Sequence, residues 1–187
     1  MKRLNYSSEI MEKFAIRVLS KSFDQIYENY IWHNKDNDFD FTSQDDTIAL
    51  EVATILPQNI INVIQYEKTL DNGKIPDIYK VISAHVDSDG ELLSYYGGSM
   101  YEIRKAIVNM IDKKESKRIN RTKKYVRYEL CLCIDEGVLF NTVRDFEFII
   151  NSNILNRTGF SRLFLITSSN FYVIENNIIQ EYKRIID

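Results

Sequence analysis

Two segments decide the fold: Asn37-Asp38-Phe39-Asp40-Phe41 and Thr47-Ile48-Ala49-Leu50-Glu51-Val52-Ala53. Polar and apolar residues alternate strictly from Asp38 to Phe41, and the second segment is short and mostly apolar, as β-strands with a buried face are. The polar residues 43–46 between them favour a tight turn. We therefore expect the two segments to pair as an antiparallel hairpin.

This hairpin has two plausible registers. A turn centred on Gln44 and Asp45 places Asp38 opposite Glu51, whereas a shift by two residues places Asp40 opposite Glu51 instead. Both registers give the same two faces. One is apolar and consists of Phe39, Phe41, Ile48, Leu50 and Val52; the other consists of Asp38, Asp40, Ala49, Glu51 and Ala53.

Three acids on one face of a hairpin have two interpretations. Like charges on paired strands repel each other, and a solvated face tolerates that cost. Alternatively, Asp38, Asp40 and Glu51 converge on a divalent cation such as Mg²⁺, which takes one or two protein carboxylates together with water and phosphate oxygens. A hydrated Mg²⁺ held in this way can deliver hydroxide to a phosphodiester.

The rest of the chain predicts a single α/β domain over residues 1–187. Apolar residues spaced by three and four predict helices from Ser8 to Tyr27 and from Met100 onwards. Further helices are expected over 59–70 and 141–154, further strands over 128–134, 163–167 and 171–174, and a hairpin over 81–86 and 91–96. Strands and helices in this order predict a central mixed sheet flanked by helices.

The composition excludes several classes of protein. The chain of 187 residues is 44% hydrophobic and 27% charged, with six Gly and two Pro, which is globular rather than disordered. No apolar run is long enough to span a bilayer, and residues 1–6 lack the apolar core of a signal peptide. Two Cys without matching ligands do not make a zinc site. A cytoplasmic protein without a membrane partner is predicted.

Positive charge is concentrated in one segment. Residues 100–128 contain ten Lys or Arg against three Asp or Glu, whereas the whole chain has a net charge of −3. Such a segment is either a solvated helix face or a docking surface for an acidic or phosphate-bearing partner. Spacings of three and four predict a shared nucleic-acid-binding surface made of Lys113, Lys114, Lys117, Arg121 and Lys124.

The hairpin resembles the PD-(D/E)xK, or restriction-endonuclease-like, superfamily. The motif of that superfamily is an Asp near the start of one strand and a Glu-x-Lys on the next, and here Asp38 and Glu51 lie 13 residues apart. An N-terminal helix often supplies another Glu, for which Glu12 (or Glu9) is the candidate. The resemblance implies the restriction-endonuclease-like fold, with an inserted β-hairpin within about 57–98.

One position departs from the motif. Ala53 stands where the resemblance expects the lysine that helps to activate the attacking water. Some members of the superfamily move this role to another side chain, and Lys123 or Lys124 could approach from the basic segment. The catalytic set implied by the resemblance is therefore Asp38, Glu51, Glu12 and Lys124.

Two functions follow from these features. The first is a metal-dependent, nuclease-like protein that acts on nucleic-acid phosphodiesters as an Mg²⁺-dependent endonuclease, with Asp38, Asp40 and Glu51 as metal ligands. The second is an inactive relative that binds nucleic acid or a protein, as phage or mobile-element inhibitors of host defence do by analogy. A homodimer is compatible with both. The intact acids favour the first function, and Ala53 favours the second.

Overall fold

The computed structural model describes residues 8–33, 39–55, 100–134, 152–167 and 170–185. In chain order, its elements are α1 (Ser8–Ser22), the 3₁₀ helix η1 (Gln25–Asn29), β1 (Ile31–Trp32), β2 (Phe41–Thr42), β3 (Ile48–Ile55), α4 (Met100–Asn120), β4 (Arg127–Ile134), the 3₁₀ helix η2 (Ser152–Arg157), β5 (Arg162–Ile166), β6 (Asn170–Glu175) and β7 (Ile178–Lys183).

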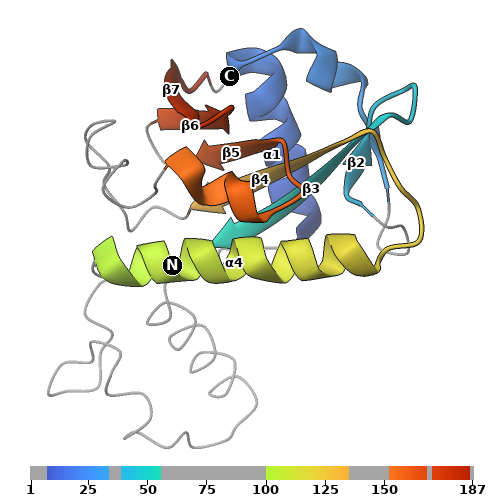
Figure 1. The fold of residues 1–187 in the computed structure, drawn as a ribbon. Helices are drawn as coiled ribbons and strands as arrows, with labels where there is room; N and C mark the ends of the chain where they lie inside the picture. Colours follow the sequence, from blue (N-terminus) through green and yellow to red (C-terminus); the bar gives the residue numbers. More distant parts are fainter. Residues whose placement is uncertain (1–7, 34–38, 56–99, 135–151, 168–169, 186–187) are drawn as a thin grey trace, which may run out of the picture.

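The strands form one mixed sheet of seven strands in the order β1-β2-β3-β4-β5-β6-β7. β4 runs parallel to β3 and to β5, and the remaining neighbours are antiparallel. Helices α1 and α4 pack on opposite faces of this sheet (Figure 1). The prediction of an α/β protein with a mixed sheet is therefore confirmed.

Alternation along β3 divides the core into two layers. Ala49 and Ala53 pack with Ile103 and Ile107 of α4, whereas Leu50 and Val52 pack with α1 on the other face. Both sides of a central strand are thus covered, as expected for a strand with a parallel neighbour. Glu51 lies between Ala49 and Ala53 in sequence, and it therefore belongs to the α4 face.

The hairpin before β3 forms in the shifted register. Phe41 pairs with Leu50 and Thr42 with Ala49, so the register that places Asp40 rather than Asp38 opposite Glu51 is confirmed. The expected length of its first strand is wrong, because β2 contains only Phe41 and Thr42. Phe39 lies before β2 and packs in the α4 layer, so it does not share the face of Phe41 as predicted.

Other boundaries differ from the predictions for local reasons. The first helix ends at Ser22 rather than Tyr27, because Asp24 caps η1 by accepting a hydrogen bond from the Ile26 amide (3.0 Å). Strands β1 and β7 were not expected. The predicted insert at 57–98, with its helix and hairpin, lies outside the described residues. So does most of the helix predicted over 141–154, whose last residues belong to η2.

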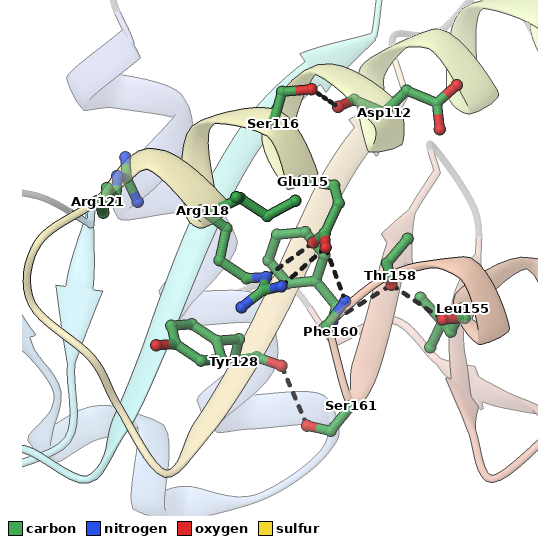
Figure 2. A network of polar contacts seen from close by, with 12 residues as sticks. Asp112, Glu115, Ser116, Arg118, Arg121, Tyr128, Leu155, Thr158, Phe160 and Ser161 are labelled. Carbon is green, nitrogen blue, oxygen red and sulfur yellow. Dashed lines mark hydrogen bonds and ion pairs between the residues drawn. The ribbon is translucent and has the colours of Figure 1, made fainter.

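Polar contacts fix the orientation of α4 above the sheet. Both carboxylate oxygens of Glu115 accept hydrogen bonds from Arg118 (2.8 Å each), and one also accepts from the Gly159 amide (3.1 Å). The Arg118 guanidinium lies over the Tyr128 ring at 4.8 Å. Figure 2 shows this network between the C-terminal end of α4 and the segment before β5. These contacts join α4 to β4 and to the segment before β5, and they limit rotation of the helix about its axis.

A side chain at position 159 would disturb this contact. A Cβ atom built on Gly159 would lie 2.2 Å from the Arg118 guanidinium. Any residue larger than glycine would therefore have to displace Arg118 from Glu115.

Candidate functional site

Glu51 is a buried carboxylate held between two cations. Its side chain is 3% exposed. One oxygen, Oε1, accepts a hydrogen bond from Lys114 Nζ at 2.5 Å, and the other, Oε2, accepts one from Arg121 Nη1 at 2.8 Å. Lys114 also donates to the backbone carbonyl of Val52 (3.3 Å). Hydrogen bonds between charged groups are the strongest that proteins form, and this carboxylate has one on each oxygen.

The helical repeat explains why these two cations meet one carboxylate. Lys114 lies in the last two turns of α4, and Arg121 directly follows the last helical residue, Asn120. Seven residues are about two turns of a helix, so the two side chains point to the same side. That side faces the sheet, and their side chains are only 12% and 16% exposed. The Arg121 guanidinium is also stacked on the Phe39 ring at 3.9 Å, a cation–π contact that orients it toward Glu51.

Asp40 supplies a second carboxylate beside Glu51. Its Oδ2 atom accepts a hydrogen bond from the Val52 amide at 2.7 Å, and so replaces a backbone acceptor where β2 has not yet begun. Burial, followed by the negative charge of Glu51, raises the pKa of Asp40 to about 6; the Val52 hydrogen bond and the charge of Lys114 act in the opposite direction. Asp40 thus lies close enough to Glu51 and Lys114 to be affected by both charges.

The structure places the predicted catalytic residues in different surroundings. Asp38 lies outside the described residues. Glu12 accepts a hydrogen bond from Trp32 Nε1 (2.8 Å), and its charge contributes to the raised pKa of Asp40. Lys124 donates to the carbonyl of Arg121 (2.7 Å) at the end of α4. The cation that reaches Glu51 from α4 is instead Lys114.

The five basic residues predicted to share one surface are divided between two. Lys113, Lys117 and Lys124 are exposed, whereas Lys114 and Arg121 point inward to Glu51. The expectation of one shared surface is therefore wrong. A spacing of three or four does not say which side of a helix faces the core, and consecutive residues such as Lys113 and Lys114 point about 100° apart.

The described carboxylates do not fit a bound Mg²⁺ as they are arranged. Both oxygens of Glu51 are engaged by cations that would repel a further one. In the described parts of the chain, no three His, Cys, Asp or Glu residues are grouped so that they could hold a metal ion. The third predicted ligand, Asp38, lies outside those parts, and the Mg²⁺ site stays a prediction.

A second buried carboxylate, Glu129 on β4, was not anticipated. It is fully buried on the α1 face, accepts a hydrogen bond from the Tyr27 hydroxyl (2.8 Å) and pairs with Arg127 and with Arg162 (3.1 Å). Arg162 in turn donates through a single nitrogen, Nη2, to both carboxylate oxygens of Glu175 (2.7 Å to each). The sequence did contain a signal for this pair, because Glu129 is the one acid in an otherwise apolar strand. A charge buried in such a strand needs an oppositely charged partner.

The two cysteine thiols lie in the core of the protein. Cys131 and Cys133 are both buried and not joined by a disulfide. Burial is the main cause that raises the pKa of Cys131 above its ordinary value, so the thiol stays protonated and behaves as a small apolar side chain.

Comparisons with other proteins give no family for this chain. No family model, curated protein or solved structure matches it. Among the described helices, none is long and apolar enough to cross a membrane.

Lys114→Met tests the buried ion pair. Removing one partner of a buried pair leaves the other charge uncompensated, which costs about 3–5 kcal/mol. Because Arg121 still pairs with Glu51, we expect the lower end of this range in urea unfolding. Lys123→Met is the matched control, because the Lys123–Asp46 pair is half exposed (48% and 50%), and we expect a much smaller loss there. Equal losses in the two variants would contradict the importance of the Glu51 pair.

Asp40→Asn tests the raised pKa of Asp40. Since the pKa is about 6 in the folded protein against an ordinary 3.8, protonation favours the folded state. The stability that this group contributes is present below pH 3.8 and is lost as the pH rises through 6. The difference in free energy of unfolding between wild type and Asp40→Asn should therefore change between about pH 4 and pH 7. A difference that is constant over this range would show that Asp40 titrates normally.

Proposed function

We propose that this protein binds nucleic acid through the outward face of α4, on a restriction-endonuclease-like scaffold, without metal-dependent cleavage at Glu51. The observation that carries the proposal is the division of the α4 cations into an inward pair and an outward set. The inward pair neutralises the residue that matches the motif glutamate. The outward set is free to meet a polyanion.

The order of the elements supports the scaffold. A helix, α1, precedes the β2–β3 hairpin that carries Asp40 and Glu51, and α4 then leads to β4, which lies parallel to β3. This basic helix running into the strand at 129–134 resembles the helix-to-strand crossing of the superfamily. The other part of the resemblance, an inserted hairpin, falls on residues outside the described ranges.

The outward face of α4 has the chemistry of a phosphate-binding surface. Most of its exposed side chains between 104 and 120 are basic or able to form hydrogen bonds; Asp112 is the one exposed acid described there, and Ile119 is an exposed apolar residue (58%). The others that define the face are Arg104, Lys105, Asn109, Lys113, Ser116, Lys117 and Asn120. Lys, Ser and Asn side chains are common partners of backbone phosphates. Such contacts are independent of base sequence, so the binding should be non-specific.

The remainder of the chain limits the strength of this binding. Residues outside 100–128 contain 14 Lys or Arg and 24 Asp or Glu, a balance of −10. This field opposes the approach of a polyanion at low ionic strength. We therefore expect weak binding that depends strongly on salt concentration.

Cleavage of nucleic acid is the second candidate function, and a specific contact favours it. Lys114 approaches Glu51 on the face that also carries Ala53, which stands at the position of the motif lysine. Asp40, Glu51 and Lys114 thus bring together two carboxylates and a lysine of the kinds that the motif contains. Because Lys114 pairs with Glu51 and neutralises it, we favour nucleic-acid binding over cleavage as the function of this protein.

Charge reversal of the outward face tests the proposed function. Each phosphate contact releases about one counterion, so the affinity for DNA should fall log-linearly with salt. Lys113→Glu combined with Lys117→Glu should weaken binding and reduce the slope by about two. The matched control combines Lys21→Glu with Lys183→Glu, two exposed positions in α1 and β7, and changes the net charge equally. Fluorescence anisotropy with duplex and single-stranded oligonucleotides gives the slopes.

The results separate the alternatives. If the wild type binds neither DNA nor RNA at low salt, or if both double variants lose binding equally, α4 is not a nucleic-acid interface. Incubation of the same oligonucleotides with Mg²⁺ or Mn²⁺ tests cleavage separately. Cleavage by the wild type that is lost in Glu51→Gln would establish the second candidate instead.

A further inference from the structure

We propose that Lys114 and Arg121 occupy the place on Glu51, beside Asp40, that a divalent cation would take, and that neutralising both of them would unmask a site for such a cation. The wild-type protein would then hold this pair of carboxylates without metal. The inference concerns the inward side of α4 and does not depend on nucleic-acid binding by the outward face.

The two cationic side chains and a single divalent cation would compensate the same negative charge. When both are ionised, the carboxylates of Asp40 and Glu51 carry two negative charges, and the side chains of Lys114 and Arg121 carry two positive charges. One divalent cation would supply the same compensation. Because Glu51 is 3% exposed, its charge needs an internal partner in either case.

The shape of the α4 face of β3 explains how two long side chains reach this point. The residues two positions before and after Glu51 on the same face are Ala49 and Ala53, and both pack against α4. Their small side chains leave space beside the Glu51 carboxylate. Lys114 enters this space far enough to donate to the Val52 carbonyl as well, while Phe39 supports Arg121 from its other side.

The contacts also explain why a metal ion should not bind beside these cations. A carboxylate oxygen that accepts a hydrogen bond from a cation at 2.5 or 2.8 Å has that cation where a metal ion would have to approach. Two positive charges a few ångströms away would further repel the metal. Removal of both cations would leave the buried carboxylate of Glu51 uncompensated beside the partly buried carboxylate of Asp40, a pair of oxygen ligands of the kind that a divalent ion prefers.

The test compares Mn²⁺ binding by wild type with that by the Lys114→Met/Arg121→Met variant, using titration calorimetry and the paramagnetic resonance signal of free Mn²⁺. We expect the double variant to gain one Mn²⁺ site at least about tenfold tighter than any in wild type, because the repulsion by two cations is gone. Adding Asp40→Asn to the double variant should abolish the site. The control Lys113→Met/Lys117→Met removes the same charge from the outward face and should gain no site.

Two results would overturn the inference. In the first, the wild-type protein binds Mn²⁺ as tightly as the double variant does, and Asp40→Asn abolishes that binding. In the second, the double variant folds but binds no Mn²⁺. If the double variant does not fold, Arg121→Gln takes its place. That change frees only the Oε2 atom of Glu51, and it should still give tighter Mn²⁺ binding than wild type. None of these results alters the salt dependence of DNA binding, so the inference and the proposed function fail independently.

Discussion

The ionised side chain of Glu51, buried between β3 and α4, is the constraint on which the rest of the structure depends. A carboxylate removed from water must be compensated by opposite charge and by hydrogen bonds, or the folded state loses several kilocalories per mole. Here the compensation comes from Lys114 and Arg121, which are 63 and 70 residues further along the chain. The position of α4 over β3 is thus fixed by charge as well as by apolar contact.

The same requirement is met on the opposite face of the sheet by a different set of groups. Glu129 is paired with Arg127 and Arg162 and bonded to the Tyr27 hydroxyl, which ties the segment after α1 to β4 and β5. Each buried glutamate therefore joins one helical segment to the central parallel strands. The cations used for this purpose are not available to a partner, and this divides the basic residues of α4 into two groups with separate roles.

Much of the fold could be predicted from local patterns. The strand around Glu51, the helix from Met100 and the strand from residue 128 follow from hydrophobic periodicity and turn residues, which act over a few positions. The register of the hairpin could only be narrowed to two choices, because alternation has a period of two. The edge strands β1 and β7 were missed because Ile31–Trp32 is too short to show a pattern, and β7 is largely exposed.

The candidate site was less predictable than the fold for a physical reason. The acids Asp40 and Glu51 could be placed together, because they lie on neighbouring strands. Which cation meets Glu51 depends on the rotation of α4 about its axis, and that rotation is set by contacts such as Arg118 on Tyr128. Lys124 was therefore expected near the acids, whereas its ammonium group is bonded to the end of α4.

A crystal structure of the wild-type protein soaked in Mn²⁺ tests the central claim most directly. We expect Lys114 and Arg121 to remain bonded to separate oxygens of Glu51, with no anomalous Mn²⁺ peak between Glu51 and Asp40. A peak that bridges these two carboxylates, with Lys114 displaced from Glu51, would contradict the claim that internal cations occupy this position.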